Sequence, residues 1–349
     1  MLPLRYWILA TFIASAAYAH LRGRVRFGWL RALTDFTVLR APLNALRYLF
    51  SRVKPTPFID PRTFPELAPL REHGREIRDE ATALGEGGHI NAADGYDDIG
   101  FNSFFRTGWT RFHVKWYGEA LPTAATLCPR TVDLLKGIPT IKAALFASLP
   151  PGSRLVRHRD PCAGSLRYHL GLVTPDSPGC CIEVDGQRYH WRDGEAVMFD
   201  ETFIHHAENT TLHERIVLFR DAERPLRVAP LVALNRWFAR VVMKAAATRN
   251  EPGERVGGVN RFFGRVYGLR LWGKALKARN RAAYHPLQWA VILGVPGLFF
   301  VRVRAHVRPR SRGRAPRPWR RRARHRRGPP VRRACWPMHR PRWPRRGCT

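Results

Sequence analysis

The chain has 349 residues, of which 45% are hydrophobic, and a formal net charge of +33. This length and hydrophobic fraction exclude a wholly disordered protein and allow one large domain or two smaller ones. Residues 302–349 contain 19 Arg and no Asp, Glu or Lys, which leaves a charge of +14 on the rest of the chain. The six Cys are irregularly spaced and form no CxxC pair, so a zinc ribbon or a disulfide scaffold is not expected.

An apolar stretch opens the chain. Tyr6–Ala19 contains fourteen uncharged residues, fewer than the roughly 20 that a membrane span needs. Ala17–Ala19 resembles the cleavage site of an export signal, but the Arg residues that follow favour retention on the cytoplasmic side. We therefore predict an uncleaved membrane anchor over residues 1–20, with a cleaved signal as the alternative.

Residues 21–55 form a basic segment. Residues 21–54 hold eight Arg or Lys and a single acid, Asp35, interleaved with aromatic and aliphatic side chains. This composition fits an amphipathic helical segment that lies on an anionic membrane surface. A basic helix packed on the following domain fits the same composition, so both interpretations stay open.

A folded domain is predicted over residues 56–227. A helix is expected to begin at the capping box of Thr63–Glu66 and to end at Gly85–Gly88. A second helix is expected over Thr131–Leu149, interrupted near Gly137. Short strands separated by turns follow, with a tight hairpin turn at Asp185–Gly186, and this spacing predicts a small antiparallel barrel or jelly roll. The expected strands are Arg167–Val173, Cys181–Val184, Gln187–Trp191, Ala196–Phe199 and Ile216–Phe219.

The C-terminal part changes character twice. Residues 228–301 are predicted to be basic and helical, with a second apolar membrane segment over 287–301 that either lies on the surface or re-enters the membrane. Residues 302–349 have 8 Pro and no apolar periodicity, which predicts a disordered tail. Such a tail could bind nucleic acid or anionic lipid, or have no function, but no recognisable motif in the body indicates specific nucleic-acid binding.

One group of residues indicates a metal site. His158 and Asp160 are two residues apart, so on an extended strand they would share a face. With His205 from a later strand they would supply two imidazoles and a carboxylate, the ligand set of non-haem Fe(II) oxygenases. A solvated polar loop is the alternative, and spacing alone does not choose between His205 and His206. Arg215 is suited to grip the far carboxylate of a dicarboxylate cosubstrate through two parallel hydrogen bonds.

The motifs resemble those of a known family. The string HRDPCAGSLRYHLGL over His158–Leu172 resembles the signature of the aspartyl/asparaginyl β-hydroxylase family, and its later blocks match Arg192–Glu195, Phe199–His205 and Arg215–Phe219. Within this family the chain is similar to the bacterial lipid A 2-hydroxylases. That similarity includes the block FNSFFRTGW over Phe101–Trp109 and covers roughly residues 1–300.

The resemblance implies a fold, cofactors and site residues. The expected fold is mainly β: a double-stranded β-helix, or cupin-like jelly roll, with flanking helices and membrane-associated segments at both ends. Iron is expected on His158 and His205, which the motif favours over His206, with Asp160 as ligand or holder of a metal-bound water. The cosubstrates are 2-oxoglutarate and O2. The residues expected to bind 2-oxoglutarate are Arg215, His169, Arg167 and Ser148, which lies beside the Ala147 that occupies the position of a family Ser.

The resemblance also implies a function. We expect an Fe(II)/2-oxoglutarate-dependent dioxygenase that hydroxylates C2 of a secondary acyl chain of lipid A or a related anionic glycolipid. It would act at the bacterial inner membrane with its catalytic domain facing the cytoplasm. Two alternatives are a hydroxylase of Asp or Asn side chains in proteins and a non-catalytic membrane-associated binding protein.

Overall fold

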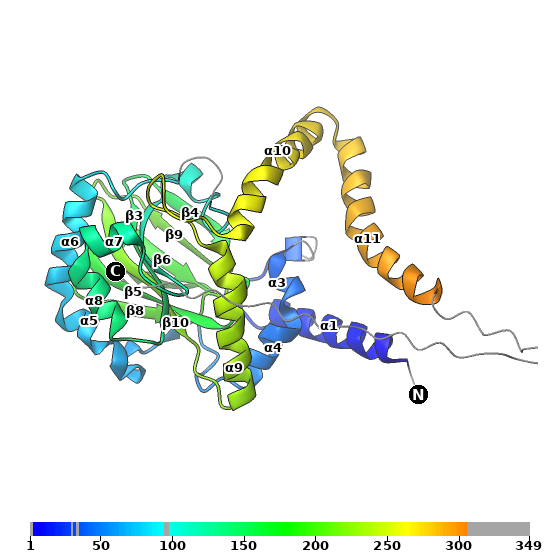
Figure 1. The fold of residues 1–349 in the computed structure, drawn as a ribbon, viewed down its shortest axis with the longest axis horizontal. Coiled ribbons are helices and arrows are strands. Elements are labelled where there is room, and N and C mark those ends of the chain that lie inside the picture. The colour runs from blue at the N-terminus through cyan, green and yellow to red at the C-terminus, as the bar shows by residue number, and fades with distance from the viewer. Residues whose placement is uncertain (1–2, 29–30, 33–34, 94–97, 306–349) are drawn as a thin grey trace, which may run out of the picture. The chain divides into compact units, whose positions relative to one another are not determined.

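The computed structural model describes residues 3–28, 31–32, 35–93 and 98–305. The chain divides into two compact units, residues 1–281 and residues 282–349. The first unit contains all the named strands (Figure 1). In the second unit the described residues belong to one helix, α11 (Arg281–Ala305). All but the first four residues of the predicted 302–349 tail lie outside the described residues.

Two antiparallel sheets form the centre of the first unit (Figure 1). The large sheet has the strand order β1-β8-β5-β10-β3-β2, and the small sheet has the order β4-β9-β6-β7. From β3 onward the chain passes repeatedly between the two sheets, as in a jelly roll. The predicted β core with flanking helices is therefore confirmed. The strands are β1 (Phe58–Ile59), β2 (Thr110–Trp116), β3 (Ile141–Leu149), β4 (Arg154–His158), β5 (Ser165–Val173), β6 (Cys180–Val184), β7 (Gln187–His190), β8 (Ala196–Phe199), β9 (His205–Asn209) and β10 (Arg215–Glu223).

The large sheet is buried on both faces. His169 on β5 pairs with Phe219 on β10, and these residues belong to the inner face, which packs against the small sheet. The alternate residues, such as Leu170 and Leu218, belong to the outer face beneath the helices. Since side chains alternate along a strand, every second residue of these central strands is directed into the space between the sheets.

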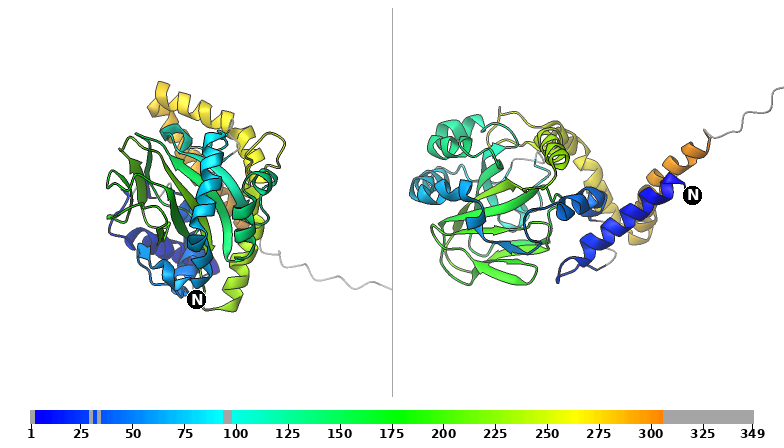
Figure 2. Two further views of the ribbon diagram at one scale, coloured as in Figure 1. Left: turned by 90° about the vertical axis from the view of Figure 1, so that its left-hand side faces the viewer. Right: turned by 90° about the horizontal axis from the view of Figure 1, so that it is seen from below.

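Helices cover the outer face of the large sheet. Helix α6 packs against β5 and against α8, and it crosses the sheet in Figure 2. Its apolar residues Ile77, Ala81 and Leu84 are buried in the same core as Leu170. The helical segments of this layer are η1 (Pro61–Thr63), η2 (Pro65–Leu67), α5 (Ala68–Glu72), α6 (Gly74–Glu86), α7 (Pro122–Leu127) and α8 (Pro129–Lys136).

The helices that flank the barrel on its other sides come from both ends of the unit. Arg22, just after α1, pairs with Asp200 through a 2.5 Å Nη2–Oδ2 contact. Asn44 on α4 donates to the Pro161 carbonyl oxygen at 3.0 Å. The segments before the barrel are α1 (Leu4–Leu21), α3 (Phe36–Leu39) and α4 (Ala41–Leu49). Those after it are α9 (Ala229–Phe238), the π-helix η4 (Ala239–Met243), η5 (Lys244–Ala246) and α10 (Gly258–Arg279).

Among these described helices, none combines the length and the hydropathy that crossing a bilayer requires. The membrane-associated segments predicted over 1–20 and 287–301 remain predictions.

The five predicted strands are confirmed, but two helix predictions were wrong in part. Asp60, not Thr63, caps the first helical turn, because its carboxylate accepts from the Arg62 N–H at 2.9 Å. The expected single helix is broken into short segments, in which Pro69 lies in the first turn of α5 and Gly74 begins α6. Residues 141–149 form β3 rather than a helix. This strand is buried on both faces, so its Ala- and Leu-rich sequence shows no alternation.

The predicted hairpin turn is confirmed. It connects β6 and β7, and Asp185 and Gly186 have φ angles of 50° and 83°. Both values lie in the left-handed region that the Asp-Gly pair tolerates, as a two-residue hairpin of this kind requires.

Candidate functional site

Three side chains predicted from the motifs converge at one end of the barrel. His158, the last residue of β4, pairs in register with His205, the first residue of β9. Their ring centroids are 4.2 Å apart, and Asp160 Oδ1 lies 4.0 Å from His158 Nε2. One ligand atom from each of the three residues lies within 4.8 Å of the others. The expectation that His158 and Asp160 share a strand face was wrong, because Asp160 lies in the loop after β4.

The hydrogen bonds of the two imidazoles fit a metal site. His158 Nδ1 lies 2.7 Å from the Val156 carbonyl oxygen, and His205 Nδ1 lies 2.9 Å from the Phe203 carbonyl oxygen. Since a carbonyl can only accept, each Nδ1 carries the proton and each Nε2 keeps its lone pair. Burial lowers the pKa of both rings, that of His205 to about 3. Both rings are therefore neutral at pH 7, which is the form that binds a metal ion.

The carboxylate of Asp160 is held by a buried arginine. Arg167 on β5 donates through Nη2 to Asp160 Oδ2 at 2.6 Å. Its guanidinium also contacts Glu201 and, through Nε, Asp221 Oδ1 at 3.0 Å. Burial, the largest single influence, raises the pKa of Asp160, but the charge of Arg167 and several smaller contributions together outweigh it and lower that pKa. Asp160 is therefore ionised, with one oxygen bound to Arg167 and the other turned toward His158. Two neutral imidazoles and one carboxylate are a donor set that suits Fe(II).

Donors without partners lie on the inner face of the large sheet. Arg215 begins β10, is 2% exposed, and has its Cζ 4.3 Å above the Trp191 ring. Burial lowers the pKa of Arg215 to about 10, so the guanidinium is still charged at neutral pH. His169 lies between the rings of Trp191 and Phe219. Among the described residues, Arg215 Nε and both ring nitrogens of His169 have no hydrogen-bond partner. Buried donors of this kind need an acceptor, and a dicarboxylate would supply one.

The two other residues predicted to bind the cosubstrate already have partners within the protein. Arg167 is bound by three carboxylates and holds Asp160, as described above. Ser148 pairs with Ile216 and belongs to the outer face, where its hydroxyl contacts Glu214. Ala147 lies on the inner face with Val217. The structure therefore brings His158, Asp160, His205 and Arg167 together and places Arg215 and His169 on the inner face, but it does not bring Ser148 to them.

Other residues of the site were not predicted from the sequence. The centroid of the Phe104 ring lies 4.7 Å from that of the His158 ring. Tyr117 donates its hydroxyl to Asp221 Oδ2 at 2.8 Å, and Ser165 donates to Glu201 Oε1 at 2.7 Å. The sequence signal for these residues was that Phe104, Ser165 and Glu201 lie in blocks resembling the family, which assigned them no role.

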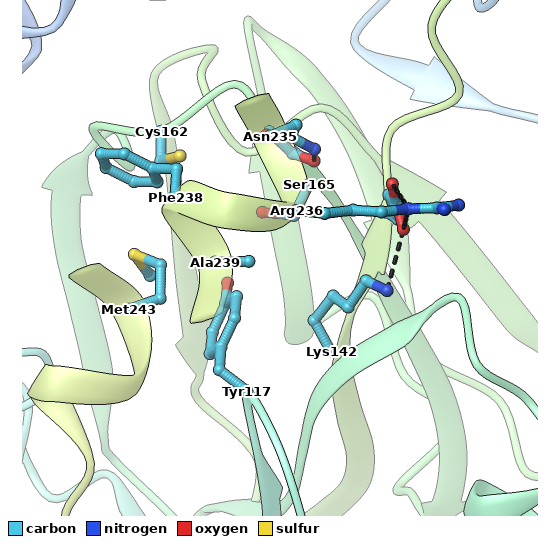
Figure 3. Close-up of a pocket in the computed structure, with 11 residues that line it drawn as sticks. Tyr117, Lys142, Cys162, Ser165, Asn235, Arg236, Phe238, Ala239 and Met243 are labelled. Atoms are coloured by element: carbon cyan, nitrogen blue, oxygen red, sulfur yellow. Dashed lines mark hydrogen bonds and ion pairs between the residues drawn. The ribbon is translucent and has the colours of Figure 1, made fainter. Parts of the chain in front are cut away.

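A cavity lies near Glu201 and Asp221, two of the acids that contact Arg167, between the end of the large sheet and α9 (Figure 3). Tyr117 and Ser165, the residues that bond to Asp221 and Glu201, line it together with Phe238 and Met243. Its lining includes none of His158, Asp160 and His205. The cavity therefore borders the residues that orient the candidate metal site and is not the metal site itself.

Comparison with known proteins gives the family. The family profile described as aspartyl/asparaginyl beta-hydroxylase matches residues 71–225. The chain is 32% identical over 200 residues to the ornithine lipid ester-linked acyl 2-hydroxylase of Rhizobium tropici, a match that covers 56% of this chain and 71% of that protein. The chain belongs to the aspartyl/asparaginyl β-hydroxylase family. The predicted family is thus confirmed, and so is the prediction of an enzyme, a hydroxylase of the dioxygenase kind.

More distant family members match a smaller part. The human aspartate beta-hydroxylase domain-containing protein 2 is 33% identical over 141 residues, which is 38% of its own length and 38% of this chain. Among solved structures, a prolyl-4-hydroxylase of Pseudomonas putida is 19% identical, with a TM-score of 0.30 over 44% of this chain and 88% of that one. The matched residues 71–225 include every residue assigned above to the candidate metal and cosubstrate sites.

Proposed function

We propose that this β-hydroxylase family member uses Fe(II) and 2-oxoglutarate to hydroxylate C2 of a fatty acyl chain in a membrane lipid. The observation that carries the proposal is the convergence of one ligand atom from each of His158, Asp160 and His205 within 4.8 Å. His158, Asp160 and His205 would hold the iron. Arg215 and His169 would hold 2-oxoglutarate, because their buried donors lack partners among the described residues.

When bound, iron and 2-oxoglutarate supply the oxidising chemistry, in which one oxygen atom of O2 enters succinate, CO2 is released, and the other oxygen atom enters a C–H bond. The chain's own residues orient and shield this chemistry. The Val156 and Phe203 carbonyls fix the two imidazoles, and Arg167 fixes Asp160. The Phe104 ring, 4.7 Å from that of His158, would limit the access of water to the site.

The proposed acceptor is an acyl chain of a membrane lipid. The R. tropici relative, by its name, is an acyl 2-hydroxylase of ornithine lipid. The motifs of the chain favour lipid A or a related anionic glycolipid, modified on the cytoplasmic side of the bacterial inner membrane. An ornithine-type lipid is the second candidate, because the match to that relative covers 71% of its length. Both acceptors present the same chemistry, a C–H bond next to an acyl carbonyl in a lipid.

Lipid mass spectrometry tests the proposal. Cells that express the chain should contain lipid A, or the ornithine-type lipid, with one additional oxygen atom on an acyl chain. His205→Ala should abolish this product. The matched control is His206→Ala, because His206 is the next residue, faces Glu183 at 3.9 Å, and is outside the metal cluster. Equal activity of the two variants would refute the site assignment.

Assays of the purified protein distinguish the alternative functions. Turnover of 2-oxoglutarate with soluble Asp- or Asn-containing peptides, and none with lipid, would identify a protein hydroxylase. A folded protein that binds no Fe(II) under anaerobic conditions would identify a non-catalytic binding protein. Lipid-dependent turnover that requires His158 would support the proposed function over both.

A further inference from the structure

Helix α10 (Gly258–Arg279) has an unusual surface. It contains six Arg or Lys and no acidic residue. Between these cations, large apolar side chains point away from the protein: Phe262 is 65% exposed, Leu269 is 72% exposed and Trp272 is 58% exposed. A solvated helix does not need exposed aromatic and aliphatic residues, and a helix that binds only nucleic acid does not need Leu269. Cations interleaved with Trp, Phe and Leu are the composition of helices that lie in an anionic membrane surface.

One side of α10 is fixed to the body of the unit. Asn260, which is fully buried, accepts from the Ile99 N–H at 2.9 Å and donates to the Ala246 and Ala247 carbonyl oxygens. Tyr267, two helical turns later and 2% exposed, accepts through its hydroxyl oxygen from Arg106 Nη2 at 2.5 Å. These two contacts hold α10 against the segment 98–107.

That segment also contacts the candidate metal site. Its Phe104 ring is 4.7 Å from the His158 ring, and Arg106, the partner of Tyr267, is only two residues further along the chain. Asp98, at the start of the segment, accepts from the Phe101 N–H and pairs with Arg111 on β2. Helix α10 is therefore connected to the His158 ring through the Arg106–Tyr267 hydrogen bond, the two chain residues back to Phe104, and the Phe104–His158 ring contact.

We infer that α10 docks the protein on an anionic lipid bilayer, and that the 98–107 segment transmits this docking to the Phe104 ring beside His158. The occupant of the exposed face of α10 is the bilayer surface, because six cations and no acid complement anionic headgroups while Phe262, Leu269 and Trp272 enter the interface. Docking through α10 would bring the site up to its lipid acceptor. The inference rests on the proposed function for the identity of that acceptor, but the docking itself requires no turnover.

Hydrogen–deuterium exchange of the full chain tests the docking locally. Vesicles of phosphatidylcholine with phosphatidylglycerol should slow exchange in residues 258–279 and 98–107 at least threefold, whereas vesicles of phosphatidylcholine alone should not. Arg270→Glu with Lys274→Glu should remove this protection. The matched control, Arg71→Glu with Arg75→Glu, reverses two exposed cations at the same spacing on α5 and α6 and should keep it. Because exchange is measured separately for each segment, binding of the vesicles by the Arg-rich residues 302–349 would not by itself slow exchange in residues 258–279.

Three outcomes would overturn the docking inference. They are no change in 258–279 while the protein sediments with the vesicles, equal loss of protection in the control variant, and protection of 258–279 that rises with protein concentration without vesicles. The last would show that a second copy of the chain covers α10.

Tyr267→Phe tests the path to the site. This variant removes one hydroxyl, so it should keep the vesicle-induced protection of 258–279 but lose that of 98–107. Unchanged protection of 98–107 would overturn the coupling. If the exchange results hold but no lipid is hydroxylated, the docking stands and only the proposed function fails.

Discussion

Arg167 has a positioning role that the motif alone does not show. The resemblance places it by the cosubstrate, and in the structure its guanidinium is shared among Asp160, Glu201 and Asp221. Burial raises the pKa of Glu201 and of Asp221, so these acids bind Arg167 at the cost of desolvation. The arrangement fixes the direction of Asp160 and therefore the third corner of the metal site.

The role of Arg167 as a positioning residue can be measured. Arg167→Lys keeps the charge but loses the planar fork that reaches three carboxylates. We expect this variant to bind Co(II), as a spectroscopic substitute for iron, about 10- to 100-fold more weakly. Arg78→Lys is the control, because Arg78 forms only an exposed pair with Asp193. An unchanged Co(II) affinity with a raised KM for 2-oxoglutarate would instead show that Arg167 acts on the cosubstrate and not by positioning Asp160.

His113 provides a pH-dependent prediction away from the metal site. It is fully buried, and its nearest charged partner, Asp98 Oδ2, lies 3.8 Å from Nε2, beyond hydrogen-bond distance. Burial lowers the pKa of His113 to about 4, below its unfolded value of about 6.5. The unfolded chain therefore takes up this proton first as the pH falls, and the contribution of His113 to stability is complete above pH 6.5 and is lost toward pH 4.

His113→Phe keeps the aromatic volume and cannot titrate. Relative to the unmodified protein, we expect its free energy of unfolding to improve by about 3 kcal/mol between pH 7 and pH 4. Urea unfolding at several pH values measures the difference. A difference that stays constant across this range would show that His113 is not buried in its neutral form.

At the scale of elements, the sequence predicted those strands whose ends are marked by local patterns such as turn residues. The strands β6, β7 and β8 are short, and turn residues such as Asp185–Gly186 separate them. Strand β3 was missed because burial on both faces removes the alternation. The candidate metal ligands were found because His158 and Asp160 lie in one family motif and His205 ends another. The partners of Arg167 were not found, because Glu201 and Asp221 come from a distant turn and a distant strand end, and only the sheet register brings them together.

The β6–β7 turn gives a prediction at this scale. Gly186 has a φ of 83°, and a Cβ added there would meet only Val25 Cγ2, at an ordinary 3.6 Å. The cost of Gly186→Ala is therefore conformational, and we expect a loss of about 1–2 kcal/mol in the free energy of unfolding. Gly268→Ala, within α10 and with open space around it, should instead add about 0.5–1 kcal/mol. Equal effects of the two substitutions on thermal unfolding would contradict this account.

At the scale of the whole molecule, the segments outside the predicted 56–227 domain are structural parts of it. Asp200 is 1% exposed and pairs with Arg22 from the N-terminal segment as well as with Arg224. Asn250, from the segment that follows the barrel, accepts through Oδ1 from the backbone N–H of His113 at 2.7 Å. Glu254 accepts from Thr123. These contacts satisfy groups of the barrel and of its covering helices from outside the predicted boundaries.

A fragment of residues 56–227 should therefore not fold stably, whereas residues 1–281 should unfold at the same temperature as the full chain. Removing one partner of a buried ion pair costs up to about 3–5 kcal/mol, so the loss of Arg22, one of the two ion-pair partners of Asp200 among the described residues, takes away a sizeable part of the about 5–15 kcal/mol that stabilises a domain. The fragment also loses the Asn44 and Asn250 side chains, which bond to the β4–β5 loop and to β2. Circular dichroism melting of the three chains measures this. A cooperative transition of the 56–227 fragment within a few degrees of that of 1–281 would show that the flanking segments are accessories, and that the barrel alone satisfies its buried charges.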